Sequence, residues 1–390
     1  MDIEVLPLRA PAPEVEAKPL FPFLDLKAQF QSIRPEIMAA VEAVMEGQHF
    51  ILGPEVERLE DAIKSFTGAR FAVSCASGSD ALLLSLMAVG VGPDDEVITS
   101  PFTFGATAGA IARLGARPVF VDIDPRTFNL DSRELAQAVT ARTKAIIPVH
   151  LFGLVAEMDT VMSVAAQCGA AVIEDAAQSL GAAYKGKAAG TIGTTGCFSF
   201  FPSKNLGGAG DGGLITTNRA DLAARLKTLR VHGASKKYQY QILGINSRLD
   251  ALQAAILRVK LPYLTRWTEA RRRNAGRYHS LIMECGLLGQ IQLPVEPENY
   301  VHVYNQFSIR AKDRDALVRY LQARGVPTEI YYPSPLHLQP AYAALGHRGG
   351  DFPHAEAACR EVLSLPIYPE LKPDQLETVV SAIAAFYRGI

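Results

Sequence analysis

The chain has 390 residues, of which 48% are hydrophobic and 20% charged, enough for one large α/β domain and a smaller one. Its formal net charge of -1 gives no reason to expect nucleic acid or an anionic membrane surface as a partner. The five cysteines are scattered and never in C-x-x-C spacing, which argues against a disulfide framework and against a zinc or iron–sulfur site. We therefore expect no metal and a reducing, cytoplasmic setting.

The first segment, residues 1–20, is rich in proline, alanine and glutamate, and we expect it to form a flexible N-terminal arm. It carries acids and prolines where a signal peptide would need a positive and then an apolar segment. The longest apolar stretch, Ala81 to Val91, is about half as long as a membrane-spanning helix. No membrane segment is expected.

From the arm to residue 255, short apolar runs alternate with segments of helical periodicity. Nearly continuous apolar strands that alternate with helices are typical of a mostly parallel sheet with both faces covered. Ligands of such sheets bind at the carboxyl ends of the strands. Acids and glycine-rich turns follow several of the runs, which are 71–74, 96–100, 118–122, 144–149 and 171–174.

Residues 75–80 (CASGSD) lead directly into a helical run, so they gather backbone N–H groups and hydroxyls at the start of a helix. Such a place binds anions, although the same residues also fit a plain helix cap. The next loop, residues 101–107 (PFTFGAT), places Phe102 and Phe104 over the end of the sheet. An aromatic ring there can stack on a flat ligand or belong to the core.

The run from Ala171 ends in two acids, Glu174 and Asp175. Because side chains alternate along a strand, the two acids must point to opposite faces of the sheet. Asp175 is the better placed to pair with the protonated pyridine nitrogen of pyridoxal phosphate, which needs such a partner to act as an electron sink. It could instead cap a following helix.

Lys204 ends the apolar run that starts at Phe198, and five glycines follow it by Gly213. A lysine at the end of a buried strand is desolvated enough to offer a neutral amine to an aldehyde, which is Schiff-base chemistry. A lysine is more commonly a solvated charge, but the flanking phenylalanines disfavour that here. The glycines also satisfy the G-x-G-x-x-G pattern of a nicotinamide oxidoreductase, but residues 214–217 look like a strand instead of the required helix.

Residues 256–390 are expected to form a connecting helix and a small C-terminal domain. Helical spacing extends over 249–287, with a kink predicted at Pro262. The runs 306–310 and 327–332 look like strands. The three arginines 271–273 are typical of a solvated helix face.

These motifs, in this order and spacing from about Phe23 to the C-terminus, resemble the DegT/DnrJ/EryC1/StrS sugar aminotransferases, pyridoxal phosphate enzymes of fold type I. The resemblance implies an α/β fold, with a large, mostly parallel seven-stranded sheet domain over 21–255 and a smaller α+β domain. It makes Lys204 the catalytic residue that carries pyridoxal 5'-phosphate. It places the other cofactor-binding residues as follows: Asp175 at the ring nitrogen, Gln178 at the phenolic oxygen, Phe104 on the ring, and Gly78, Ser79 and Ser199 at the phosphate.

The resemblance also implies a homodimer whose active site is shared across the interface. Asn246 would reach the phosphate of the partner's cofactor, and Arg248 would lie near the substrate diphosphate or a carboxylate. This chain has Ile245 where the family usually has an aromatic residue. Tyr332 and His337 match a segment that closes over the nucleotide sugar. As alternatives, Asn246 caps a helix and His337 is a structural residue.

The implied reaction moves an amino group from glutamate to a nucleotide-linked keto-sugar, with C3 of a dTDP-3-keto-6-deoxyhexose favoured. A UDP-linked 3-keto-uronic acid and amination at C4 are the alternatives. Relatives that replace the lysine by histidine become dehydratases, so Lys204 favours transamination. A non-catalytic regulator on the same scaffold is expected to lack the lysine or the pyridine acid, and this chain has both.

Overall fold

The computed structural model describes residues 18–389, so the arm expected over 1–20 lies almost entirely outside the described residues. The helices are α1 Leu26–Ser32, α2 Arg34–Gly47, α3 Pro54–Thr67, α4 Gly78–Ala88, α5 Gly105–Arg113, α6 Met158–Cys168, α7 Ala220–Leu229, α8 Ala251–Lys260, α9 Leu264–Glu284, α10 Arg314–Ala323, α11 Pro353–Glu361 and α12 Pro373–Arg388. The strands are β1 Phe71–Cys75, β2 Glu96–Thr99, β3 Arg117–Phe120, β4 Thr143–Ile146, β5 Ala171–Asp175, β6 Ala183–Tyr184, β7 Lys187–Ala188, β8 Thr195–Ser199, β9 Gly213–Thr217, β10 Ala234–Lys236, β11 Gln239–Tyr240, β12 Ile291–Gln292, β13 Tyr300–Val301, β14 Phe307–Ala311 and β15 Val362–Leu365.

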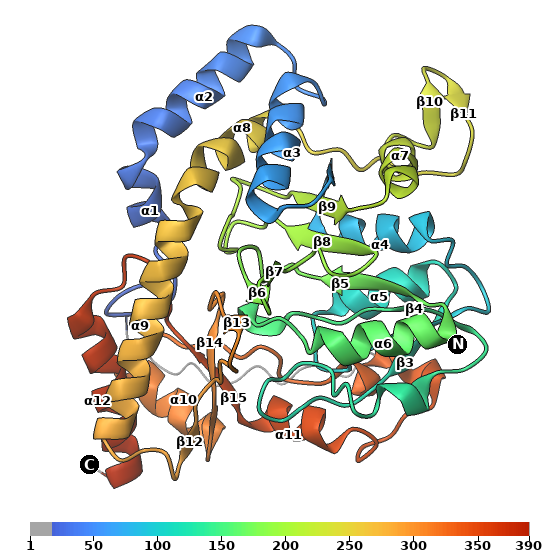
Figure 1. The fold of residues 1–390 in the computed structure, drawn as a ribbon. Helices are drawn as coiled ribbons and strands as arrows, with labels where there is room; N and C mark the ends of the chain where they lie inside the picture. The colour runs from blue at the N-terminus through green and yellow to red at the C-terminus, as the bar shows by residue number, and fades with distance from the viewer. Residues whose placement is uncertain (1–17, 390) are drawn as a thin grey trace, which may run out of the picture.

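A seven-stranded sheet forms the centre of the molecule, in the order β1-β9-β8-β5-β4-β2-β3 (Figure 1). The pairs from β8 through β5, β4 and β2 to β3 are parallel. β9 alone runs against its neighbours β1 and β8. The predicted mostly parallel sheet is therefore confirmed.

Both faces of this sheet are buried, because consecutive residues of six of its strands enter different cores, while β3 lies at the edge. One core contains helices α3, α6 and α8, and the other contains α4, α5 and α7. This explains why apolar residues stand next to one another in these strands instead of at every second position. The first core takes Ala72, Ile98, Ile146, Val172, Phe198 and Leu214, and the second takes Val73, Val97, Ala145, Ile173, Cys197 and Ile215.

A separate core lies under the three-stranded sheet β12-β14-β15 and the helices α9, α10 and α12. Phe21, which the sequence analysis placed in the first domain, packs in this core. The strand predicted at 306–310 is confirmed as β14. The strand predicted at 327–332 is wrong, since only Glu329 forms a bridge, to Ser364, and the rest of that run is irregular. The division at residue 255 stays a prediction.

The long helix predicted over 249–287 is confirmed as α8, a 3-10 turn at Leu261–Tyr263 that contains Pro262, and α9 (Figure 1). The prediction of a solvated face at the three arginines is wrong for Arg271, which is buried. Its guanidinium donates to the carbonyls of Tyr304 and Ile367, at 3.2 and 2.6 Å, which ties α9 to two other segments.

Among the helices within residues 18–389, none is both long and apolar enough to cross a membrane.

Candidate active site

A cavity of about 620 Å³ opens where several strands of the large sheet end. Its wall combines the turn before α4, the loop before α5, the residues after β4 and β5, the loop between β8 and β9, and the segment at 331–332. Eight of the predicted site residues line it: Gly78, Ser79, Phe104, Asp175, Gln178, Ser199, Lys204 and Tyr332.

Lys204 lies in the β8–β9 loop, in a turn closed by its own N–H, which donates to the carbonyl of Phe201 at 2.9 Å. Burial lowers the pKa of its amine to about 8, and the charge of Asp175 opposes this shift. A lysine with such a pKa has a substantial neutral fraction near physiological pH, which a nucleophilic amine requires.

Asp175 is buried at the end of β5, and burial raises the pKa of its carboxyl. Its Oδ2 accepts a hydrogen bond of 2.8 Å from the hydroxyl of Thr107, and its Oδ1 accepts one of 3.3 Å from the N–H of Ala177. The predicted alternative of a helix cap is wrong, because the chain turns at residues 177–178 and then enters β6. Gln178 accordingly lies in a turn and not on a helix.

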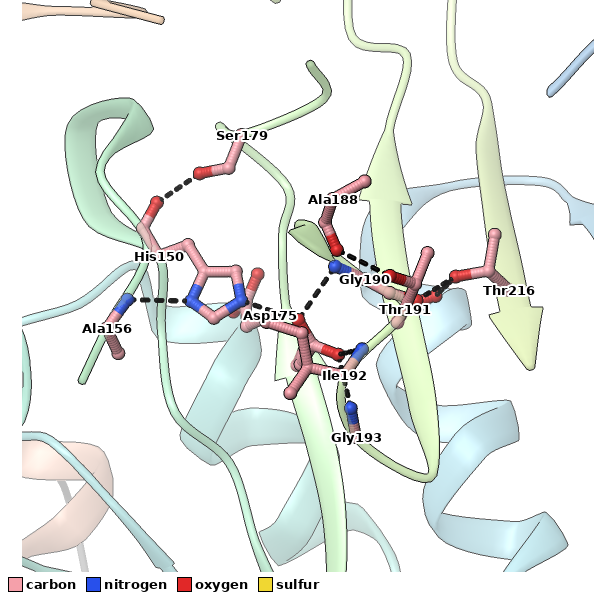
Figure 2. A network of polar contacts seen from close by, with 12 residues as sticks. His150, Ala156, Asp175, Ser179, Ala188, Gly190, Thr191, Ile192, Gly193 and Thr216 are labelled. Carbon is pink, nitrogen blue, oxygen red and sulfur yellow. Dashed lines mark hydrogen bonds and ion pairs between the residues drawn. The ribbon is translucent and has the colours of Figure 1, made fainter. Parts of the chain in front are cut away.

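Glu174 points to the opposite face of β5, as the alternation of a strand requires. Its carboxylate accepts hydrogen bonds of 2.6 to 2.7 Å from the N–H groups of Gly190, Ile192 and Gly193. The Nε2 of His150 lies 2.9 Å from the same carboxylate, and the His150 ring stands between β5 and Ala156 (Figure 2). Because the N–H of Ala156 donates to Nδ1, the proton of this ring is on Nε2, and the imidazole is neutral.

The turn before α4 has the form of an anion-binding site. Ser77 accepts the N–H groups of Asp80 and Ala81, and within residues 18–389 the N–H groups of Gly78 and Ser79 have no acceptor. A β-carbon on Gly78 would lie 2.7 Å from that of Ser199, so only glycine lets the two segments meet. Free donors at the start of a helix suit a phosphate group.

Phe104 and Tyr332 form an aromatic side of the cavity, with ring centroids 6.4 Å apart. Phe104 is 62% exposed, whereas Phe102 is 1% exposed and belongs to the core. Gln178 is held in place: its Oε1 accepts from the N–H of Phe152 at 2.6 Å, and its Nε2 lies 3.4 Å from the hydroxyl of Tyr332.

Three predicted residues lie outside the cavity wall. Asn246 is exposed, and it does not cap α8, because that role belongs to Asp250. Arg248 is half-buried beyond the wall. His337 is buried, with Nε2 3.1 Å from Glu356, which agrees with the structural alternative for this residue.

Two residues beside this site, Thr107 and His150, were given no role from the sequence. A signal existed for His150, since it directly follows the apolar run 144–149 as Asp175 follows its own strand. Thr107 gave no comparable signal, because in the sequence a threonine at the start of a helix looks the same whether or not it has a role in a site.

The arrangement fits pyridoxal phosphate at three points. Lys204 offers an amine to the aldehyde, Asp175 offers a buried anion to the ring nitrogen, and the Gly78 turn offers donors to the phosphate. When bound, this cofactor supplies an electron sink for carbanion chemistry.

The G-x-G-x-x-G pattern is followed by strand β9 instead of a helix, so its interpretation as a dinucleotide-binding motif is wrong. The fold and the site define a pyridoxal phosphate-dependent aminotransferase of fold type I.

The chain belongs to the DegT/DnrJ/EryC1/StrS aminotransferase family, whose sequence model matches residues 31–384. It is 52% identical over 368 residues to a pleiotropic regulatory protein of Geobacillus stearothermophilus, covering 94% of this chain and 98% of that protein. It is 45% identical to a UDP-N-acetyl-3-dehydro-alpha-D-glucosamine 3-aminotransferase of Acidithiobacillus ferrooxidans, with 94% and 98% covered. It is 42% identical to a dTDP-3-amino-3,4,6-trideoxy-alpha-D-glucose transaminase of Streptomyces venezuelae, with 94% and 96% covered.

Among solved structures, the fold is similar to that of S. venezuelae DesV. The TM-score is 0.91 at 41% identity, and the match covers 95% of this chain and 99% of that one.

Proposed function

We propose that this enzyme transfers an amino group from glutamate to C3 of a nucleotide-linked 3-keto-sugar, with a dTDP-3-keto-6-deoxyhexose as the first candidate. The observation that carries the proposal is Lys204, a lysine of lowered pKa in a cavity that also holds Asp175 and an anion-binding turn. Support for C3 comes from two relatives, one named as the 3-aminotransferase of a UDP-linked 3-dehydro sugar and one named for a dTDP-linked 3-amino sugar. A UDP-linked 3-keto sugar, including a uronic acid, is the alternative, and amination at C4 stays open.

In this proposal Lys204 moves a proton from the α-carbon of glutamate, and later delivers one to the carbon that receives nitrogen. Asp175 holds the cofactor's ring nitrogen in its protonated form, and Gln178 orients the ring through its phenolic oxygen. Gly78, Ser79 and Ser199 bind the phosphate. Phe104 lies on the ring, while Tyr332 and Arg248 face the sugar nucleotide. Five free cysteines support a reducing, cytoplasmic setting.

Incubation with glutamate and a panel of keto-sugars tests the substrate. The panel holds dTDP- and UDP-linked 3-keto and 4-keto sugars, and the products are weighed by mass spectrometry. The proposal expects one amino group on a 3-keto sugar, with the dTDP-linked 6-deoxyhexose turned over fastest. Faster conversion of the UDP-linked 3-keto sugar would select the alternative, and conversion of 4-keto sugars alone would contradict amination at C3.

Replacing Lys204 tests the assignment of the catalytic group. Lys204→Ala should lower turnover by about 10²–10⁴-fold, since it removes the acid/base group and the covalent attachment point. Lys227→Ala, at an exposed lysine of α7, is the matched control and should keep full turnover. Borohydride reduction of the wild-type holoenzyme followed by peptide mapping should place the label on Lys204, and a label elsewhere would refute the assignment.

Asn246 is exposed and away from the cavity of its own chain, which supports a role at the site of a second copy. We therefore propose a homodimer. Mixing the inactive variants Lys204→Ala and Asn246→Ala should restore activity, because the mixed dimer has one site with both native residues. Random exchange of subunits would recover about a quarter of the wild-type activity. No recovery after verified exchange would place Asn246 in its own subunit's site.

The name of the relative at 52% identity keeps a regulatory role as a second candidate. Both groups that a non-catalytic regulator is expected to lose, Lys204 and Asp175, are present in the cavity. Turnover of any keto-sugar in the substrate panel would favour the enzymatic role over the regulatory one. A holoprotein that binds the sugar nucleotides without turning over any of them would favour the regulator.

A further inference from the structure

The hydroxyl of Thr107 contacts the acid at the centre of the site. Thr107 is fully buried in the first turn of α5, and its Oγ1 lies 2.8 Å from Oδ2 of Asp175. Behind it, the buried Thr103 places its own hydroxyl 3.0 Å from that of Thr107. We propose that Thr107, supported by Thr103, is a positioning residue that keeps the Asp175 carboxylate ionised and oriented toward the ring nitrogen of the cofactor.

The donors and acceptors in this chain of contacts have only one consistent order when Asp175 is ionised. An ionised carboxylate can only accept, so Thr107 must donate to it. The oxygen of Thr107 then accepts from Thr103. Both O–H dipoles therefore point toward the carboxylate, and aligned hydrogen bonds of this kind strengthen one another in a buried site.

Asp175 needs this support because its surroundings disfavour a charge. Burial raises the pKa of its carboxyl, and the bond from Thr107 is the largest of the effects that lower it again, ahead of the Ala177 N–H. The titratable groups that face it are Lys204 from the β8–β9 loop, His150 after β4, Tyr332 from the 331–332 segment and Cys197 in β8. His150 is neutral, so Lys204 is the only one of these four groups that can carry a positive charge. Because the pKa of its amine is lowered, Lys204 is not always protonated near physiological pH.

The same contacts fix the orientation of the carboxylate. Thr107 donates to Oδ2 and Ala177 to Oδ1, so each oxygen is held by one donor. A carboxylate has about four lone-pair sites, which leaves acceptor capacity for a pyridinium N–H. Losing one donor would both favour protonation and free the carboxyl group to rotate.

Binding of two ligands to the apoprotein tests the proposal without reference to turnover. The ligands are pyridoxal 5'-phosphate and its 1-deaza analogue, in which C–H replaces the ring nitrogen. Thr107→Val keeps the shape of the side chain and removes the donor. It should raise the dissociation constant of pyridoxal phosphate by about tenfold to a hundredfold and leave that of the analogue unchanged. Thr107→Ser, which keeps the hydroxyl, should bind both ligands as the wild type does.

A purely structural role for Thr107 predicts a different result. In that case Thr107→Val weakens both ligands equally, and this outcome overturns the proposal. In an Asp175→Asn background the proposal expects Thr107→Val to cause no further loss for pyridoxal phosphate, and an additive loss also overturns it. If Thr107→Val does not fold, Thr103→Val takes its place: it must weaken pyridoxal phosphate more than the analogue, and equal weakening refutes the proposal.

Discussion

Glu174 and Asp175 are neighbours in β5, yet their surroundings give the two carboxylates different roles. Glu174 accepts from three backbone N–H groups and from the Nε2–H of His150, so its carboxylate is fully hydrogen-bonded within the protein. Asp175 has two donors and borders the cavity. A carboxylate whose acceptor sites are all used by protein donors has a structural role, whereas a carboxylate with a free acceptor site can pair with a cationic group of a ligand.

The pKa of Lys204, lowered to about 8 by burial, predicts how the apoprotein takes up its cofactor. Only the neutral amine attacks an aldehyde. The rate of uptake should therefore fall about tenfold for each pH unit below the pKa and level off above it. Stopped-flow absorbance across this range measures the midpoint.

Asp175→Asn is the control for this pH dependence. The charge of Asp175 raises the pKa of Lys204, so removing that charge should move the midpoint to lower pH. A midpoint that is identical in both proteins would mean that the titration belongs to the free cofactor and not to Lys204.

The turn before α4 and the end of strand β8, to which we assign the cofactor's phosphate, meet at Gly78 with no space between them. Gly78→Ala would place a β-carbon 2.7 Å from that of Ser199 and push the two segments apart. We expect the affinity of the apoprotein for pyridoxal phosphate to fall by about tenfold or more, and its affinity for pyridoxal, which lacks the phosphate, to change little. Equilibrium titration with both ligands measures the difference.

Gly276→Ala is the matched substitution, since a β-carbon there meets no atom within 4 Å. It lies in α9 and should leave both affinities unchanged. Equal losses for the two ligands in Gly78→Ala would show a general distortion of the site instead of a damaged phosphate site.

The sequence predicted a feature best where the residues that indicate it lie together in one short segment. The runs that became β1, β2, β4, β5 and β9 were visible because continuous apolar stretches mark strands buried on both faces. Asp175 could be predicted for the same reason, as a polar residue at the end of such a run. Lys204 was indicated by the phenylalanines and glycines around it, but it lies in the loop after β8 and not at the end of a strand, as the sequence had suggested. The donor from Thr107 to Asp175 could not, because it joins residues 68 positions apart. The run 327–332 misled because its aromatic residues line the cavity and are not part of a sheet.

Arg271 connects parts of the chain that are distant in sequence. Its guanidinium, with a pKa lowered to about 10 by burial, donates to carbonyls of Tyr304, Asn305 and Ile367. Arg271→Met would leave these carbonyls without their donor. The free energy of unfolding should fall by about 2–4 kcal/mol, measured by denaturant titration of the holoenzyme.

Arg273→Met is the comparison, because Arg273 is exposed on the same helix. That variant should change the free energy of unfolding by less than about 0.5 kcal/mol. Similar losses in both variants would assign the effect to the helix and not to the buried contacts of Arg271.

The reversed direction of β9 affects how the site could change over time. If the strand after β8 ran parallel to it, the chain would need a crossover connection to return to the other end of the sheet before the two strands could pair. The reversal lets the loop with Lys204 return at the rim where it began, and Gly213 then enters β9 so close to Ser77 that a β-carbon would lie 2.2 Å from that carbonyl oxygen. The stretch between 200 and 212 is thus anchored at both ends, and its middle is packed as well, since Leu206 is buried and the carbonyl of Gly207 accepts from Lys260 at 2.6 Å. Evolution can therefore change little of it without moving Lys204 relative to the turn before α4.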